Sequence, residues 1–287
     1  MRTLDAQQIE RWFAATLPRR RHQFGLYLLA GVILGTLLMP LAAGEEPSAA
    51  TGWSFLLPMS LLAALFAGGW YVNRRRRRDK RTLSRAWEQV QLEDWDGAEA
   101  TLSELLERPI HAASDRCQAF RLLAEVAEHA GQYEAAAQVY ETLLLQRIGD
   151  GYQLQEVQLA SCAIKLRNEE LTDAVRLIER LARVPMPPAL KAVHDLIRLY
   201  QQVFMGHFDD AVEKAEERRK LYRRHLSTRA GYGYGLLAAA MHHLGRREEA
   251  SRLWADATTL IRADELVRSY ALLGTVSKDY PATEHPV

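Results

Sequence analysis

The chain has 287 residues, a length that allows one or two domains, and its 37 Lys and Arg residues nearly balance its 36 Asp and Glu residues. Its two cysteines, Cys117 and Cys162, are far apart in the sequence. This excludes a disulfide scaffold and a cysteine zinc site, and it is typical of a reducing compartment. The charge is unevenly divided, because residues 1–81 hold 12 basic and 5 acidic residues, a net of +7 that leaves −6 for the remainder.

The first 72 residues carry the pattern of a membrane hairpin. Residues 1–23 form a predicted cytoplasmic N-terminal segment with a short amphipathic stretch around Trp12. Two uncharged stretches follow at 24–43 and 53–72. Each has about 20 residues, enough to cross roughly 30 Å of hydrocarbon as a helix. We therefore expect a transmembrane helical hairpin over 24–72 with a short external loop.

Charged residues around the two stretches predict their orientation. The loop between them contains Glu45 and Glu46 but neither Lys nor Arg, whereas arginines flank the stretches on their other sides. Positive residues stay on the cytoplasmic side, so the N-terminus and the part after the hairpin are expected in the cytoplasm. The expected location is the inner (plasma) membrane, as a multi-pass protein. Alternatively, the first stretch is a signal peptide cleaved near Ala42–Gly44, which leaves the C-terminal part in the cytoplasm as well.

An arginine-rich linker is predicted at 73–81. Its arginines could neutralise the phosphates of a nucleic acid or contact anionic lipid headgroups. The position directly after an apolar stretch favours lipid, and we expect no nucleic-acid partner. The residues predicted to contact the membrane surface are Arg74, Arg75, Arg76, Arg77 and Arg78.

An internal repeat occupies 82–276. A short turn followed by an alanine recurs along it. The residues three positions before that alanine are 38, 38, 37 and 39 residues apart: Trp95, Tyr133, Leu171, Phe208 and Arg247. A near-constant period of this length is typical of stacked helical hairpins. The tail 277–287 is expected to be flexible. Apolar spacing and Gly and Pro breaks predict paired helices at 82–93 and 96–108, 114–130 and 133–147, 152–168 and 171–183, 189–205 and 208–224, 228–244 and 247–262, and a closing helix at 264–276.

Large and small apolar residues recur at matching places within these helix pairs. The second repeat has Phe120, Leu123, Ala124, Gly131, Tyr133, Ala136 and Tyr140. The last repeat has Tyr234, Leu237, Ala238, Gly245, Ala250, Trp254 and Ala257. This pattern resembles the tetratricopeptide repeat (TPR) family, although its period exceeds the family's usual length of about 34 residues. The resemblance implies an all-α fold: after the transmembrane helical hairpin, an α-solenoid of about five TPR-like helix pairs with a closing helix.

The fourth repeat departs from the register of the family. That register would place Asp195 and Arg198 in buried slots, which is unfavourable for charged side chains. A shift by one residue, which we expect, instead buries Leu196, Leu199, Tyr200 and Val203.

No sequence motif indicates a catalytic or cofactor site. The chain lacks a phosphate-binding loop of the Gly-x-x-x-x-Gly-Lys type, a His-Glu-x-x-His zinc motif and a Gly-x-Ser-x-Gly motif. The adjacent His242 and His243 would point about 100° apart on a helix, a poor geometry for sharing one metal. The glycine-rich stretch 231–235 is expected to be a flexible entry to a helix, and the basic stretch 216–225 a solvated face. We predict no enzyme activity, no cofactor, no metal and no small-molecule substrate.

The resemblance to TPR proteins implies a groove, lined by the first helix of each pair, that binds segments of other proteins. We expect a membrane-anchored interaction scaffold that recruits or organises partner subunits of an inner-membrane complex. The layout is similar to that of the inner-membrane repeat subunit of Pel-type exopolysaccharide secretion machines. The alternative is a quality-control adaptor that presents clients to a membrane protease or chaperone; a channel subunit is disfavoured, because neither apolar stretch contains an ionisable residue. The groove residues are predicted to be Arg121, Glu125, Glu128, His129, Leu159, Leu166, Arg167, His242 and His243.

Overall fold

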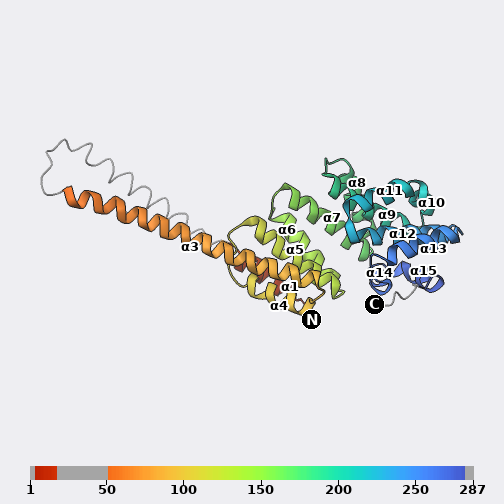
Figure 1. Ribbon diagram of the computed structural model, residues 1–287, viewed down its shortest axis with the longest axis horizontal. Coiled ribbons are helices and arrows are strands. Elements are labelled where there is room, and N and C mark those ends of the chain that lie inside the picture. Colours follow the sequence, from red (N-terminus) through yellow and green to blue (C-terminus); the bar gives the residue numbers. More distant parts are fainter. Residues whose placement is uncertain (1–3, 18–50, 282–287) are drawn as a thin grey trace. The chain divides into compact units, whose positions relative to one another are not determined.

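The structure is a computed structural model that describes residues 4–17 and 51–281. The chain divides into two compact units, Met1–Leu154 (unit 1) and Gln155–Val287 (unit 2), and every regular element in the described ranges is helical. The all-α prediction is therefore confirmed. Figure 1 shows the helices along the chain.

Unit 1 is built from two helix pairs and an N-terminal helix. Helix α3 packs on α4 and α5, and α5 packs on α4 and α6. The predicted linker 73–81 and the first predicted repeat helix are both part of the single helix α3. The elements are α1 (Ala6–Ala15), α3 (Thr51–Gln91), α4 (Trp95–Leu106), α5 (Ala113–His129) and α6 (Tyr133–Leu145), and α7 (Gly151–Arg167) begins in this unit.

The predicted membrane location is contradicted by the structure. The first apolar stretch, 24–43, lies outside the described residues, and the second, 53–72, is part of α3, which continues without a break through the arginines after it. Among the helices that the structure describes, none combines the length and the apolar character needed to cross a membrane. The expected multi-pass inner-membrane location is therefore wrong. The expected role in an inner-membrane exopolysaccharide complex loses its basis with it.

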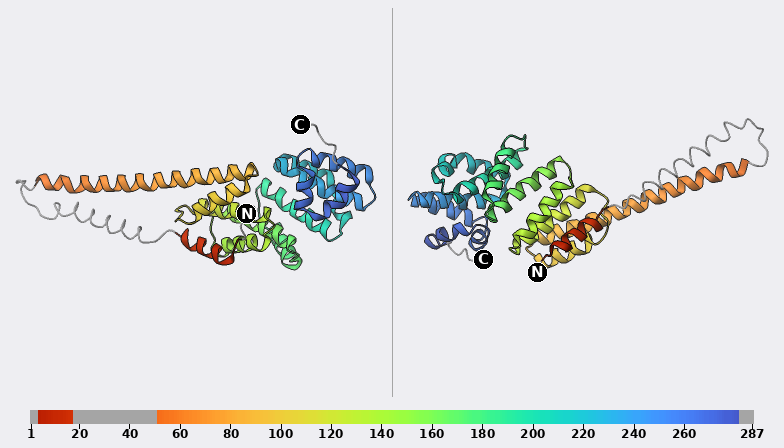
Figure 2. Two further views of the ribbon diagram at one scale, coloured as in Figure 1. Left: turned by 90° about the horizontal axis from the view of Figure 1, so that it is seen from below. Right: turned by 180° about the vertical axis from the view of Figure 1, so that it is seen from behind.

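The N-terminal helix α1 belongs to the core of unit 1. It packs against α4 and α6, and Figure 2 shows it in red beside the yellow and green helices of this unit. The ring of Phe13 stacks on Phe120 of α5 with centroids 3.7 Å apart. Two backbone contacts hold the ends of the segment: the Leu4 N–H donates to Gln132 Oε1 at 2.8 Å, and the Ile110 N–H to the Thr16 carbonyl at 3.2 Å. The predicted amphipathic stretch is thus a docked helix.

Unit 2 continues the helix pairs. Its first helices are the C-terminal part of α7, α9 and α12, and α12 packs against α9, α10, α11 and α13. The predicted helix 208–224 is divided in two, and the predicted closing helix 264–276 is divided among three short elements. The remaining elements are α8 (Leu171–Ala182), α9 (Pro188–Phe204), α10 (Phe208–Glu213), α11 (Ala215–His225), η1 (Ser227–Arg229), α12 (Ala230–His243), α13 (Arg247–Thr258), α14 (Ala263–Ser269), η2 (Ala271–Leu273) and α15 (Gly274–Asp279).

The turn inside every helix pair uses one residue with left-handed backbone geometry. These residues repeat with the period of the sequence pattern, and their φ angles lie between 59° and 77°: Glu93, Gly131, Glu169, Gly206 and Gly245. Such geometry costs glycine nothing and is uncommon for other residues. The same turn therefore forms in all five pairs, including the two in which glutamate replaces glycine.

A second repeated feature is an alanine five residues after that turn residue. Each of these alanines has an exposed fraction of 0%: Ala98, Ala136, Ala174, Ala211 and Ala250. A methyl group at this position lets the two helices of a pair approach closely. The alanine that recurs in the sequence pattern is therefore a buried residue in all five pairs.

The glycine-rich stretch 231–235 is the start of helix α12, not a flexible entry. A Cβ atom at Gly233 would stand 2.4 Å from the ring of Tyr222 on α11. At Gly231 it would stand 3.0 Å from Ile261, and at Gly235 it would stand 3.1 Å from Leu273. The three glycines thus let neighbouring elements approach α12 on two sides.

This packing predicts that Gly233→Ala destabilises unit 2. The added methyl overlaps the ring of Tyr222, and we expect the free energy of unfolding to fall by about 1–3 kcal/mol. Gly151→Ala is the matched control, because nothing lies within 4 Å of a Cβ there; it should leave stability unchanged or raise it by up to about 1 kcal/mol. Urea unfolding of both variants measures the difference, and equal stabilities would contradict the close approach at Gly233.

Candidate functional site

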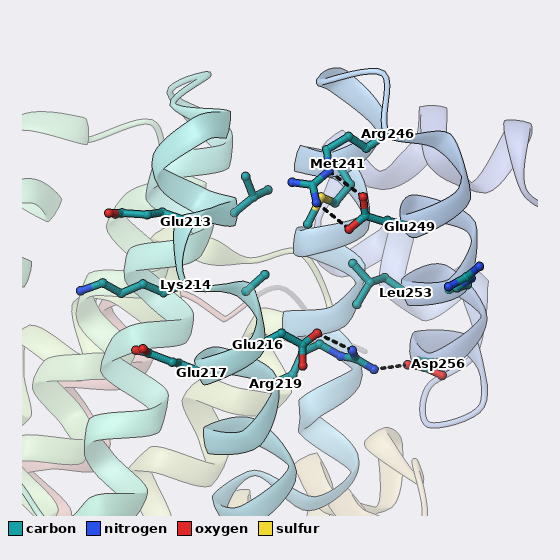
Figure 3. A pocket seen from close by; sticks show the side chains of 13 residues that line it. Glu213, Lys214, Glu216, Glu217, Arg219, Met241, Arg246, Glu249, Leu253 and Asp256 are labelled. Carbon is teal, nitrogen blue, oxygen red and sulfur yellow. Dashed lines mark hydrogen bonds and ion pairs between the residues drawn. The ribbon is translucent and has the colours of Figure 1, made fainter.

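A cleft of about 740 Å³ lies in unit 2 between α10–α11 and α13 (Figure 3). Met241 of α12 and Leu253 of α13 contribute buried apolar side chains to its floor. The backbone of Glu213 and Lys214 lines the opposite wall, while their side chains point away from α13. The cleft therefore has an apolar interior and a wall formed by an interruption between two helices.

The interruption at Lys214 creates this wall. Lys214 has φ −113° and ψ 29°, outside helical geometry, so α10 ends at Glu213 and α11 starts at Ala215. The buried Arg218 donates from Nη1 to the carbonyl of Ala211, which in an unbroken helix would accept from the fourth following residue. A guanidinium group thus replaces a backbone donor at the break.

Arg218 is part of a buried polar network between α9 and α11. Its Nη2 donates to Gln202 Oε1 at 2.9 Å, and its Nε lies 3.3 Å from Asp195 Oδ2. The hydroxyl of Tyr222 donates to the same Asp195 oxygen at 2.7 Å. Burial, and after it the carboxylate of Asp195, raises the pKa of Tyr222 well above its ordinary value. A charged residue on α9 is therefore matched by partners on the neighbouring helix.

The network resolves the register of the fourth repeat. Asp195 is half-buried and paired, and Arg198 is exposed. The expected shift by one residue is confirmed, since the structure buries Leu196, Leu199, Tyr200 and Val203. The prediction of a fully solvated face at 216–225 is wrong for Arg218 and Tyr222, which are buried in the core.

Ion pairs stand at both ends of the cleft. At one end Arg219 of α11 binds Glu216 at 2.8 Å and reaches Asp256 of α13 at 3.0 Å. Its hydrogen bond to Glu216 is the largest cause of a raised pKa of Arg219. At the other end Arg246 binds Glu249 through two contacts of 2.7 and 2.6 Å. The acids that face the cleft are therefore held by arginines. In Figure 3 Leu253 lies between the two ends, and Met241 lies beside the Arg246–Glu249 pair.

The predicted groove residues of unit 1 lie together on α5. Arg121, Glu125, Glu128 and His129 are all half-buried. Glu128 Oε1 accepts a hydrogen bond of 2.7 Å from the hydroxyl of Tyr140, whose pKa burial raises well above its ordinary value. The ring of His129 stacks on Trp95, with centroids 3.8 Å apart. Glu128 and His129 therefore bind neighbouring helices, and Arg121 and Glu125 lie beside them.

The predicted groove residues of unit 2 have other roles. Leu159 and Leu166 are buried in the core, with exposed fractions of 1% and 0%, so they cannot line an open groove. The guanidinium of Arg167 lies over the ring of Tyr270, 5.7 Å from its centroid. These three side chains were predicted to line the groove because they occupy groove positions of the TPR pattern on the first helix of a pair. The position of a residue on its helix does not show which other elements cover it.

The two histidines of α12 each contact another element. His242 Nδ1 lies 3.3 Å from the hydroxyl of Tyr280, and its Nε2 lies 3.5 Å from Asp279 Oδ2. The ring of His243 stacks on Phe208, with centroids 4.4 Å apart. Both side chains are therefore engaged within unit 2.

The arginines predicted to contact lipid lie on α3, where Arg75 is half-buried and Arg74, Arg76, Arg77 and Arg78 are exposed. Arg74 lies over the ring of Trp70, 5.1 Å from its centroid. Because the membrane location is contradicted, contact of this stretch with lipid headgroups has lost its basis.

The buried network predicts a large effect of Arg218→Met. The variant removes the donor to Ala211 and leaves Asp195 without its cation, and we expect a loss of about 3 kcal/mol of unfolding free energy. Arg223→Met changes an exposed arginine of the same helix and should stay within about 0.5 kcal/mol of wild type. Urea unfolding followed by circular dichroism compares them. Equal stability of the two variants would contradict the role given to Arg218.

The raised pKa of Tyr222 predicts a loss of stability at alkaline pH. The unfolded chain loses this phenolic proton above pH about 10, whereas the folded protein keeps it, so stability is full below pH about 10 and falls above it. Tyr222→Phe should reduce the slope of unfolding free energy against pH by up to about 1.4 kcal/mol per pH unit. The exposed Tyr152→Phe is the control. Urea titrations between pH 8 and 11 measure the slope; identical slopes would refute the assignment.

No family model matches this chain, and no curated protein sequence matches it. Among solved structures, the crystal structure of Bacillus thuringiensis PlcR in its apo form is similar, with a TM-score of 0.54 at 13% sequence identity. The match covers 82% of this chain and 90% of the PlcR chain. At this identity the likeness shows the fold alone, and it supports an all-α arrangement of helical repeats.

Proposed function

We propose that this chain is a protein-interaction scaffold that binds a short segment of another protein in the cleft between α10–α11 and α13. The observation that carries this proposal is the construction of the cleft: an apolar floor at Met241 and Leu253 with an arginine ion pair at each end. A helical repeat fold presents such surfaces on a stable framework. The volume of about 740 Å³ is within the range of sites that enclose a few side chains.

The charges of the cleft favour binding over catalysis. Each acid that faces it, Glu216, Glu249 and Asp256, is within 3.0 Å of an arginine. A carboxylate whose oxygens already bind a guanidinium is poorly placed to take a proton from a substrate. Over all the residues that line the cleft, five acids exceed four basic residues, Arg252 and Lys214 among them, by one negative charge. We infer that the preferred segment carries one or two apolar side chains for the floor beside a basic residue.

In unit 1, we propose Arg121 and Glu125 on α5 as contacts for a second part of the partner. Both are half-buried beside the Tyr140–Glu128 hydrogen bond, which fixes the geometry of this face. Two contact sites on one chain suit a protein that organises partners, because a second contact made by the same partner benefits from high effective concentration.

Adjacent glutamates on α13 provide a matched pair for testing the cleft. Glu249 lines the cleft, whereas Glu248 does not and has a side chain that is 90% exposed. We expect a photo-crosslinking amino acid at position 249 to capture a defined segment of a partner protein in the native cell, and the same group at position 248 to capture none. Mass spectrometry identifies the crosslinked residues. Equal capture at both positions would contradict binding in the cleft, and many unrelated clients would favour the adaptor alternative.

The captured segment then allows a quantitative test with recombinant protein. Glu249→Lys removes the Arg246 pair and reverses the local charge, so we expect affinity for the segment to fall at least about tenfold, equivalent to 1.4 kcal/mol. Glu248→Lys should stay within about twofold, because exposed charges contribute little. Isothermal titration calorimetry measures both. A similar loss in both variants would show a general charge effect and overturn the proposed site.

A further inference from the structure

The last described part of the chain, residues 263–280 (the C-terminal segment), lies on the first helices of unit 2. It contains α14, η2 and α15, and all three elements pack on α12 (Figures 1 and 2). Side chains of α7 and α9 contact it as well. The segment therefore covers the helix face that the sequence predicted to be an open groove.

One aromatic side chain anchors the segment. Tyr270 leaves helical geometry, with φ −139° and ψ 95°, and its ring is buried. The ring centroid lies 4.6 Å from that of Tyr200 on α9 and 5.7 Å from that of Tyr232 on α12. The guanidinium of Arg167 on α7 lies 5.7 Å from it, within the range of a cation–π interaction. Three first helices thus hold one ring, as a pocket holds the central residue of an interface.

Polar contacts surround this anchor on both sides. The hydroxyl of Tyr232 donates to Glu265 Oε1 at 2.8 Å on one side. On the other side His242 contacts the Tyr280 hydroxyl at 3.3 Å and the Asp279 carboxylate at 3.5 Å. Both side chains, Tyr232 and His242, belong to α12, the helix on which all three elements of the segment pack. On this face, Tyr232 therefore binds an acid that precedes Tyr270 in the sequence. His242 contacts an acid and a hydroxyl group that follow it.

Apolar contacts complete the fit. Leu266, Leu273 and Val276 are fully buried. A Cβ atom at Gly235 would stand 3.1 Å from Leu273 Cδ1, so the absence of a side chain there opens the space that Leu273 fills. The segment thus presents leucine, tyrosine and leucine in the order Leu-x-x-x-Tyr-x-x-Leu.

The segment has little structure of its own. Its helices have 7, 3 and 6 residues, and none has a side-chain N-cap hydrogen bond. Helices of this length are not stable alone in water. In unit 1, α5 packs on both helices of the preceding pair, whereas α14 packs mainly on α12, η2 and α15. The segment is therefore held by the helix face that it covers. It does not pack on both helices of the preceding pair, as α5 does.

We propose that the first-helix face of unit 2 is a binding site for a short segment of another protein, and that the C-terminal segment is its resident competitor. The partner carries the chemistry of the resident: an aromatic anchor between two leucines, with an acid at either end. It binds by displacing residues 263–280 from Arg167, Tyr200, Tyr232 and His242. None of these four residues lines the cleft between α11 and α13. The two proposed sites are therefore independent, and an experiment that refutes one leaves the other in place.

Hydrogen exchange of the full-length wild-type protein tests whether the segment opens by itself. We expect amides of residues 264–279 to exchange at least tenfold faster than those in the middle of α12, because the segment detaches while the helix pairs stay folded. Equal rates would show that the segment is an inseparable part of unit 2 and would overturn the proposal. This measurement needs no variant and stands even if a substitution unfolds the protein.

A labelled synthetic peptide of residues 263–281 tests competition at the face. It should bind full-length Tyr270→Ala, whose own segment lacks the anchor, at least tenfold more tightly than wild type. A peptide with the same Tyr270→Ala change should not bind, and a Lys278→Ala peptide, altered at an exposed residue, should bind as the parent does. Equal affinity for both proteins would overturn the proposal. So would a dimer formed by exchange of the segment between copies, seen by light scattering, because the occupant would then be a second copy.

Discussion

The structure depends on the close approach of two helices at one small residue in each pair. Five alanines occupy this position, and none of them has any exposed surface. A larger side chain there would separate the helices, and the aromatic residues between neighbouring pairs would lose their contacts. No pair can cover its apolar face alone, so a defect at one alanine also affects the pairs on either side. The left-handed turn residue, five positions earlier, brings the second helix back at the angle that this contact requires.

Local features of the fold were predictable from the sequence because they repeat. The period of the turn, the helix pairs and the buried alanines follow from residues that act within a few positions of one another. The docking of α1 and the placement of the C-terminal segment were not predictable in this way. Phe13 meets Phe120 across more than a hundred residues, and Tyr270 meets Arg167 across a similar distance. Neither contact leaves a periodic pattern, and the two segments occupy surfaces that the family resemblance would leave open.

The candidate site was the least predictable part. In the sequence, Asp195 served only to choose the register of the fourth repeat. In the structure it binds Arg218 and Tyr222, two residues that the sequence placed on a solvated basic helix. A charged residue that falls in an apolar slot is a signal to look for an opposite charge on the other helix of the same pair. Here that partner also supplies the hydrogen bond to Ala211 at the break at Lys214. Helix interruption, buried ion pair and cleft wall thus have a common origin in a few polar side chains.

The two cysteines have a practical consequence for the chemistry of this protein. Cys117 and Cys162 are both buried thiols, and burial raises the pKa of Cys162 to about 12. Since the thiolate is the form that reacts with alkylating reagents, a folded molecule offers them two poorly reactive sulfurs. A cysteine introduced at the surface would react first, so fluorophores and spin labels can be attached to the native background without removing either natural thiol. Reaction of the natural pair would report unfolding of the helix in which each one lies.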